Sequence, residues 1–243
     1  GAEGLNYKAI EYVGSGVAAM DIDDRMTLCN HAAELGAKAA ILEADEKTLQ
    51  WLQAHGAKPP QPVKADQDAV YAQSIVVDTA QLAPQVARKH QVDDIVSAHE
   101  VTHQKIQFAL IGTCTNGRLD DIRQAAAILK GRQLAPGVRM IVTPASRKIY
   151  LDALREGLIE ILTMAGASFE AAGCGTCVGI TNHLVPGNGD TVISTANRNF
   201  KGRLTNDRAE IWLGSAATVA ASALTGYITD PRTVKGGEWR SIK

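Results

Sequence analysis

The chain has 243 residues, of which 45% are hydrophobic and 21% charged, and its formal net charge is -1. This length and apolar content suit one large or two medium globular domains. The balanced charge offers no basic surface for nucleic acid, and no apolar run is long enough to cross a membrane, so neither partner is expected. Acidic residues among the first thirty positions do not fit a signal peptide, and a cytoplasmic protein is expected.

The first eighty residues predict a small α/β region. Residues 5–16 predict a short strand followed by a glycine turn. Apolar residues then recur at helical spacing over residues 23–40, with Gly36 as an interruption. A second helix is predicted over residues 43–56, because Gly56 takes a C-cap position and a proline-rich loop follows it.

The rest of the chain alternates between strands and helices. Residues 75–78 predict a strand just before a polar junction, which divides the chain into domains of residues 1–79 and 80–243. After the junction the predicted order is strand, turn, helix, strand, helix, strand and helix, over residues 105–112, 113–117, 119–131, 138–144, 146–166, 191–197 and 208–226. This alternation predicts an α/β fold with mainly parallel sheets that helices cover on both faces.

The cysteines are placed for ligation rather than for a disulfide scaffold. Cys174 and Cys177 form a CxxC inside AAGCGTCVG, and Cys114 follows the strand predicted over residues 105–112. Because α/β folds place ligand-binding loops at strand ends, three thiolates from these loops could converge on one centre. Cys29 better fits a buried free thiol.

Different kinds of site fit these cysteines. A thioredoxin-like redox pair is disfavoured, because glycines surround this CxxC and it does not open a helix. A structural zinc site would combine the three cysteines with His183 in a Cys₃His set. An iron–sulfur cluster held by three cysteines would leave one iron without a protein thiolate, free to act as a Lewis acid.

Two further groups of polar residues predict substrate contacts. Arg198 and Arg203 flank a glycine-containing turn in STANRNFKGR, and two guanidinium groups suit a substrate with several carboxylates. A solvated basic loop fits the same spacing. Asn30 and Glu34 lie four residues apart on the helix predicted over residues 23–40 and share one face, although a surface glutamate is the simpler interpretation.

Several motifs, taken in their order along the chain, resemble the aconitase superfamily and, within it, the separate large subunits of 3-isopropylmalate dehydratases and homoaconitases. They extend over nearly the whole chain and read EYVGSG, DDRMTLCNHAAELGA, IGTCTNGRLDDI, AAGCGTCVG and STANRNFKGRL. The resemblance implies two three-layer α/β/α domains like the second and third domains of aconitase. His31 stands where this family commonly has methionine.

The resemblance also implies roles for individual residues. It implies a [4Fe–4S] cluster with three thiolate ligands, Cys114, Cys174 and Cys177. It implies that substrate carboxylates are bound by two arginines, Arg198 and Arg203. Asn197 and Asn30 would support the cluster and its bound water, and Glu34 would be the active-site glutamate. The implied reaction isomerises a small 2-hydroxy acid by removing and re-adding water, as in leucine or lysine biosynthesis.

Parts of such an enzyme are missing from this sequence by the same resemblance. The family has an N-terminal domain that supplies further active-site residues, and a swivelling domain with the catalytic serine would be a separate small subunit. The chain begins with Gly1, which indicates a processed chain, a fragment or a split subunit, expected to be inactive alone. The alternative function is a catalytically incomplete iron–sulfur or zinc-binding module with a role in assembly or regulation.

Overall fold

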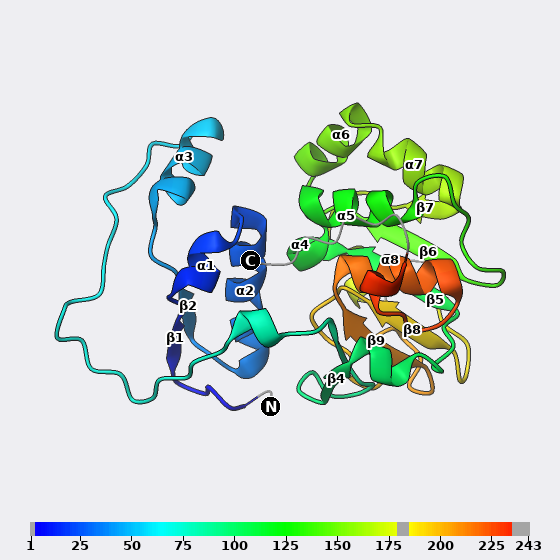
Figure 1. The fold of residues 1–243 in the computed structure, drawn as a ribbon, viewed down its shortest axis with the longest axis horizontal. Helices are drawn as coiled ribbons and strands as arrows, with labels where there is room; N and C mark the ends of the chain where they lie inside the picture. Colours follow the sequence, from blue (N-terminus) through cyan, green and yellow to red (C-terminus); the bar gives the residue numbers. More distant parts are fainter. Residues whose placement is uncertain (1–2, 179–184, 235–243) are drawn as a thin grey trace. The chain divides into compact units, whose positions relative to one another are not determined.

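The computed structural model describes residues 3–178 and 185–234, and the chain divides into two compact units (Figure 1). One unit consists of Glu3–Leu82, and the other begins at Ala83. The junction predicted after residue 79 falls within a short 3₁₀ helix, η2 (Thr79–Gln81), at the end of the first unit. None of the described helices is both long and apolar enough to cross a membrane.

The unit of Glu3–Leu82 contains short helices and a two-stranded parallel sheet. Before η2, its elements in chain order are β1 (Ala9–Glu11), α1 (Ser15–Ala19), α2 (Ile22–His31), η1 (Ala32–Leu35), β2 (Ala39–Ile41) and α3 (Glu46–Ala54). The guanidinium of Arg25 on α2 donates two hydrogen bonds of 2.7 Å to the carboxylate of Asp45, which caps α3. A charged pair therefore joins these two helices.

Two predictions for this unit are wrong. The helical region predicted over residues 23–40 ends at Leu35, because Ala39–Ile41 form β2 and bond to β1. Residues 75–78 are not a strand. Val76 is 96% exposed, and no described strand pairs with this segment to satisfy its backbone. The strand predicted near the start and the second helix are confirmed as β1 and α3.

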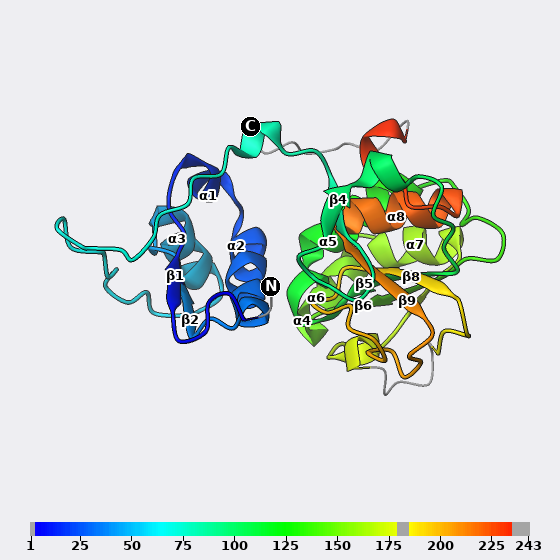
Figure 2. The ribbon, with the colours of Figure 1, turned by 90° about the horizontal axis from the view of Figure 1, so that it is seen from below.

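The unit that begins at Ala83 contains a seven-stranded sheet in the order β4-β3-β9-β8-β5-β6-β7 (Figures 1 and 2). The strands from β9 to β7 are parallel, and β3 runs antiparallel to both of its neighbours. The strands are β3 (Gln85–Ala87), β4 (Ile95–Ser97), β5 (Phe108–Gly112), β6 (Arg139–Thr143), β7 (Ala167–Phe169), β8 (Thr191–Ser194) and β9 (Glu210–Gly214).

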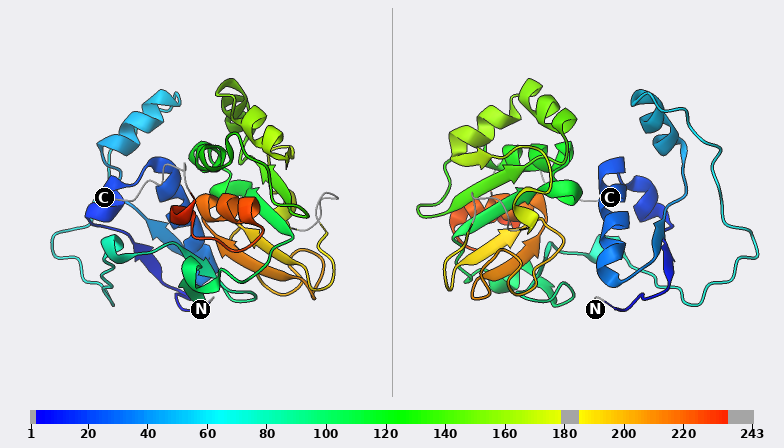
Figure 3. Two further views of the ribbon diagram at one scale, coloured as in Figure 1. Left: turned by 45° about the vertical axis from the view of Figure 1, so that its right-hand side comes forward. Right: turned by 180° about the vertical axis from the view of Figure 1, so that it is seen from behind.

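Helices and short 3₁₀ turns connect these strands, and α5, α6 and α7 pack against one another (Figure 3). They are η3 (Ala98–Val101), α4 (Thr113–Asn116), α5 (Leu119–Leu129), α6 (Arg147–Arg155), α7 (Leu158–Ala165), η4 (Gly175–Val178), α8 (Ala216–Thr225) and η5 (Pro231–Thr233). This alternation of helices with a mainly parallel sheet confirms the predicted α/β fold class.

Apolar side chains fill both faces of the large sheet, because successive residues of a strand point to opposite sides. On β5, Ala109 and Ile111 join the large core shared with α5, α7 and α8, whereas Phe108 and Leu110 join a smaller core on the other face. Fully burying one such leucine or isoleucine contributes about 1.5–3 kcal/mol. The central strands are therefore buried from both sides, and their ends are fixed in position.

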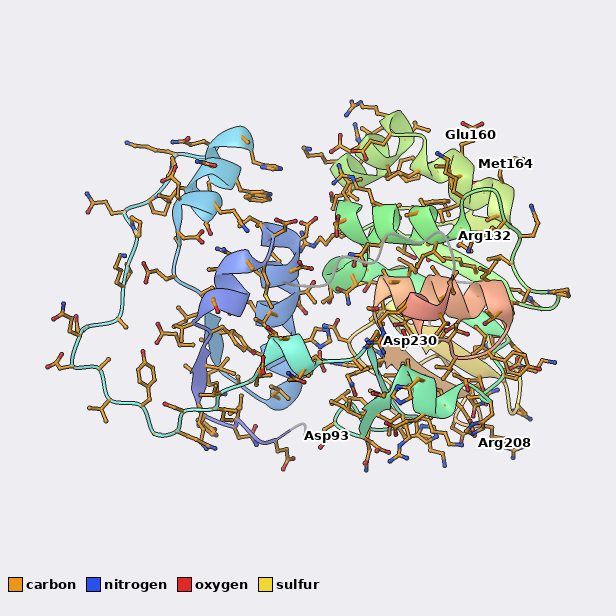
Figure 4. All side chains as sticks on the ribbon, viewed as in Figure 1. Asp93, Arg132, Glu160, Met164, Arg208 and Asp230 are labelled. Carbon is orange, nitrogen blue, oxygen red and sulfur yellow. The ribbon has the colours of Figure 1, made fainter. Side chains whose placement is uncertain are left out.

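The single helix predicted over residues 146–166 is two helices, α6 and α7. Gly157 lies between them with φ 72°, a left-handed conformation that suits glycine and ends α6. On α7, Leu162 is fully buried, whereas Glu160 and Met164 project outward (Figure 4). The apolar face of α7 thus completes the large core.

The helix predicted over residues 208–226 begins later than expected. Its first part is the strand β9, which pairs with β8 and places Ile211 and Trp212 on opposite faces of the sheet. Its second part, α8, is buried along nearly its whole length, in agreement with the predicted packing on several sides. The other predicted elements after the junction are confirmed as β5, α5, β6 and β8, with α4 at the predicted turn.

Candidate metal and substrate site

The predicted site residues of the larger unit gather at the carboxyl edge of its parallel strands. Cys114 follows β5, Cys174 and Cys177 follow β7, and Arg198 and Arg203 follow β8. These strands lie together in the order β8-β5-β6-β7, so the loops leave the same edge of the sheet. Helices α4 and η4, which carry Cys114 and Cys177, contact each other.

Cys114 lies in a tight and strained turn. The residue before it, Thr113, has φ 72°, which is a rare conformation for a β-branched residue. Thr113 is also buried, and its hydroxyl has no hydrogen-bond partner within the described residues. Strain of this kind costs about 1–3 kcal/mol and clusters at functional sites. Cys114 itself is exposed to solvent.

Hydrogen bonds join the Cys114 turn to the loop after β8. The hydroxyl of Thr115 donates to Oδ1 of Asn197, and both residues are buried. The side-chain amide of Asn116 donates to the carbonyl of Thr195 at 3.0 Å. The hydroxyl of Thr195 in turn accepts from the backbone N–H of Gly112 at 2.8 Å. Asn197, predicted to support the cluster, is thus fixed beside the turn that carries Cys114.

The CxxC residues lie in and just before the short 3₁₀ turn η4, which follows β7. Cys174 is exposed and Cys177 is half-buried, and the backbone N–H of Cys177 donates to the carbonyl of Cys174 at 3.0 Å. The guanidinium Nη2 of Arg203 lies 3.4 Å from the sulfur of Cys177. This contact places a cationic hydrogen-bond donor against one of the predicted ligands.

A buried asparagine between the two predicted substrate-binding arginines holds their loop in place. Asn199 is fully buried, and its side-chain amide donates to the carbonyls of Arg88 at 2.6 Å and Gln91 at 3.0 Å. Arg198 and Arg203 are both half-buried. Because the loop is attached to the turn between β3 and β4, it is a fixed part of this unit, and a purely solvated basic loop does not describe it.

Two buried polar residues below the cysteine loops were missed by the sequence analysis. Thr143 ends β6 and is fully buried, and its hydroxyl donates to Oε2 of Glu170 at 2.7 Å. The other carboxylate oxygen of Glu170 is buried and has no hydrogen-bond partner in the described part of the chain. Neither Thr143 nor Glu170 belongs to a recognisable motif, so the sequence alone offers little indication of a role for them.

The remaining predicted residues belong to the unit of Glu3–Leu82. Asn30 lies on α2 and is exposed, whereas Glu34 lies on η1 and is buried, so the interpretation of Glu34 as a surface glutamate is wrong. Burial lowers the pKa of the neighbouring His31, and the charge of Glu34 acts in the opposite direction. Cys29 is half-buried, and burial raises the pKa of its thiol.

The larger unit supplies thiols as its softest donors, and thiolates suit zinc or an iron–sulfur cluster. Within residues 3–178 and 185–234, no three cysteine, histidine, aspartate or glutamate side chains are grouped closely enough to hold a metal ion. His183, the fourth ligand of the predicted zinc set, lies outside the described residues. The three cysteines therefore fit a soft metal centre in donor type and in loop position, without forming a closed site.

Comparison with known proteins relates the chain to one family. A model of the aconitase family (aconitate hydratase) matches residues 1–226. The chain is 48% identical over 233 residues to 3-isopropylmalate dehydratase large subunit 2 of Archaeoglobus fulgidus. It is 49% identical over 236 residues to large subunit 1 of the same enzyme from Thermotoga maritima. It is 47% identical over 234 residues to the probable methanogen homoaconitase large subunit of Methanosarcina mazei.

Each of these alignments covers 96% of this chain but only 56%, 56% and 59% of the respective relatives. The chain thus spans somewhat more than half the length of the curated relatives that it matches. Its sequence similarity extends over both compact units.

Proposed function

The chain belongs to the aconitase family, and from this premise we propose that it is the cluster-binding part of a hydro-lyase large subunit. The proposed reaction isomerises a small 2-hydroxy acid by dehydration and rehydration, as the names 3-isopropylmalate dehydratase and homoaconitase of its relatives suggest. The observation that carries the proposal is the placement of three thiols and two arginines on loops at one edge of the parallel sheet.

The proposed cofactor is a [4Fe–4S] cluster held by three thiolates, those of Cys114, Cys174 and Cys177. When bound through three cysteines, such a cluster supplies one iron that is open to substrate and acts as a Lewis acid. Two features of this chain support the proposal. Its thiols are soft donors, and α4 and η4, which carry Cys114 and Cys177, contact each other. The buried hydrogen bond between Thr115 and Asn197 keeps the first ligand turn beside the loop that carries the arginines.

Substrate carboxylates are proposed to bind Arg198 and Arg203. A guanidinium group recognises a carboxylate through two parallel hydrogen bonds, so two arginines select an acid with more than one carboxylate. The contacts of Asn199 hold the arginine loop rigid, which lowers the entropy that is lost when substrate binds.

Asn30 and Glu34 are the proposed catalytic residues of the other unit. Glu34 is 8% exposed, and a buried carboxylate beside His31 is a suitable acid or base for moving a proton. Asn30 is proposed to support the cluster and its bound water.

The complete enzyme is proposed to need two further parts. One is the portion of the relatives' large subunits that lies outside their alignment with this chain, and the other is a separate small subunit, as the words "large subunit" in the relatives' names suggest. Leucine biosynthesis is the proposed setting for an isopropylmalate substrate. The competing function is a cluster- or zinc-binding module without catalysis and with a role in assembly or regulation, which the soft thiol donors fit equally well.

The first test is the metal content of the full chain after anaerobic reconstitution with iron and sulfide. The parent chain is expected to retain about three or four irons with matching sulfide, and mild oxidation should give the paramagnetic signal of a three-iron cluster. Cys114→Ser, Cys174→Ser and Cys177→Ser should each lose most of this iron, because each removes one ligand. Cys29→Ser is the matched control and should retain it.

Two results would contradict this assignment. Full iron and sulfide in Cys174→Ser would remove that residue from the ligand set. Stoichiometric zinc without sulfide in the parent chain would favour the structural-metal alternative. Adding the small subunit and the rest of the large subunit, then measuring hydration of an unsaturated acid, separates an enzyme from a module, because only an enzyme gains activity on mixing.

A further inference from the structure

Thr143 and Glu170 form one hydrogen-bonded pair beneath both cysteine loops. Thr143 is the last residue of β6 and lies in register with Gly112, the last residue of β5 before the Cys114 turn. Glu170 follows β7 and comes before the CxxC turn. The pair therefore links the end of β7, which leads to the CxxC, with the end of β6, which lies beside the end of β5 and its Cys114 turn.

The Cys114 turn packs directly on the backbone of Thr143. A Cβ atom at Gly112 would lie 2.9 Å from the Thr143 nitrogen, and one at Gly117 would lie 2.5 Å from the Thr143 carbonyl oxygen. Contacts this short cannot form without movement of the backbone. The absence of side chains at Gly112 and Gly117 thus brings the whole turn, with Cys114 inside it, against the end of β6.

The CxxC turn packs on the side chains of the same pair. A Cβ atom at Gly175 would lie 2.5 Å from Cγ2 of Thr143 and 2.7 Å from both the Thr143 hydroxyl and Oε2 of Glu170. Gly175 lies between Cys174 and Cys177. The positions of these cysteines are therefore set by the hydrogen-bonded surface that the pair presents to Gly175.

A role in stability alone does not account for this pair. Burying a carboxyl group costs free energy unless its oxygens are hydrogen-bonded, and Oε1 of Glu170 has no such partner within the described residues. An apolar pair of the same shape would fill the space without that cost. What the polar pair adds is a directional bond of 2.7 Å, which fixes Gly175 relative to β6.

We propose that Thr143 and Glu170 are positioning residues that set the separation of the Cys114 turn from the CxxC turn, so that the three thiolates reach one metal centre. This inference rests on the proposed ligand set. Outer residues that orient metal ligands typically change metal affinity by about 10–100-fold when they are replaced.

The test uses cadmium as a probe in the full chain, with Cys29→Ser as the background so that every remaining thiol belongs to the proposed set. Under reducing, oxygen-free conditions, thiolate-to-cadmium charge-transfer absorption reports the number of bound thiolates, and titration reports the affinity. Cys114→Ser provides the signal expected when only the CxxC binds.

Thr143→Val removes the hydroxyl and keeps the shape of the side chain. It should lower cadmium affinity about 10–100-fold and reduce the absorption to the level of Cys114→Ser. Thr143→Ser and Glu170→Gln retain a donor and an acceptor for the bond, so both should stay close to the background chain. Thr191→Val is the matched control, because Thr191 is a buried threonine at the opposite end of the parallel strands.

Thermal unfolding without metal separates positioning from stability, since a merely structural role would lower the melting temperature without selective loss of the third thiolate. If Thr143→Val does not fold, Glu170→Leu tests the same bond from its acceptor side and should give the same loss. Full affinity and full absorption in folded Thr143→Val or Glu170→Leu, with loss in Cys114→Ser, would overturn the positioning role and leave the ligand set intact. An unchanged signal in Cys114→Ser would overturn both.

Discussion

The unit that begins at Ala83 buries an apolar core on both faces of its sheet, whereas the described part of the unit of Glu3–Leu82 buries few side chains. The residues buried there are Ile22, Arg25, Ala32 and Glu34. Two of these side chains carry ionisable groups, and one of them, Arg25, is held by Asp45. The unit that begins at Ala83 is thus stabilised mainly by apolar packing, and the unit of Glu3–Leu82 depends on a polar contact.

This difference also separates the predicted site residues. The thiols and arginines extend from strands whose ends are fixed by a large core, while Asn30 and Glu34 lie in the unit with little apolar burial. Small regions with little buried apolar surface are only marginally stable by themselves. The loops that carry the thiols and arginines should therefore be robust to mutations away from Thr143 and Glu170, and the proposed catalytic pair should be sensitive to its surroundings.

The largest effect is expected from Leu162→Ala in α7. Leu162 is fully buried in the large core, so its truncation should lower the free energy of unfolding by about 2–5 kcal/mol. Urea unfolding monitored by circular dichroism measures this loss. Leu154→Ala on α6 is the matched control, because that side chain is 54% exposed and should change stability by less than about 0.5 kcal/mol. Equal effects would show that the large core is not what stabilises this unit.

A smaller effect is expected from Arg25→Met, which tests the polar contact of the other unit. Arg25 also donates to the hydroxyl of Thr48 and to the carbonyl of Ala18, so its removal takes away several of the polar contacts among α1, α2 and α3. Hydrogen bonds to charged groups contribute about 1.5–3 kcal/mol, and a loss in this range is expected for the unit of Glu3–Leu82. Hydrogen exchange of the backbone amides measures this loss of stability separately in each unit.

The control for that experiment is Arg88→Met. Arg88 pairs with Asp94 in the other unit, but its side chain is 47% exposed, so the pair should contribute no more than about 1 kcal/mol. If Arg25→Met and Arg88→Met lower the free energy of unfolding by equally small amounts, the Arg25 contact does not hold its unit together. The proposed difference between the two units would then be wrong.

The smallest effect is expected in how the stability of the unit of Glu3–Leu82 depends on pH. The hydrogen bond from Arg25 holds the pKa of Asp45 below its ordinary value of 3.8. A carboxyl group with a lowered pKa in the folded state stabilises the protein above its unfolded pKa, and this contribution is lost as the pH falls below about 4. Protection of the unit of Glu3–Leu82 should therefore decline below that pH in the parent and decline less in Arg25→Met. Identical pH profiles would contradict this linkage.

Much of the sheet could be predicted because burial and sequence pattern coincide there. The strands β5, β6 and β8 are runs of buried apolar residues between turns, and periodicity suffices to find them. The apolar residues of β9, such as Ile211 and Trp212, lie so close to the alanine-rich α8 that the two elements resemble one helix, although Gly214 ends the strand and Ser215 caps the helix. Residues 75–78 were read as a strand because β-branched residues favour strands, but pairing depends on the rest of the fold.

Only part of the candidate site could be predicted from the sequence. Cysteines are rare in this chain, and the glycine-containing loops that carry them and the two arginines are distinctive enough to be predicted as binding loops. Thr143 and Glu170 lie twenty-seven positions apart, and what brings them together is the pairing of β6 with β7. A single buried threonine at a strand end gives no signal until strand order and register are known.

The exposed segment of residues 69–77 affects how the protein behaves in concentrated solution. It reads AVYAQSIVV, with no charged residue and no proline, and its Val70 and Val76 are each 96% exposed. Short uncharged stretches rich in β-branched residues favour intermolecular β-aggregation. The acidic residues Asp68 and Asp78 bracket this stretch, and their like charges on neighbouring molecules oppose such stacking. Salt screens the repulsion between such exposed charges, so storage at low salt should keep the protein monodisperse.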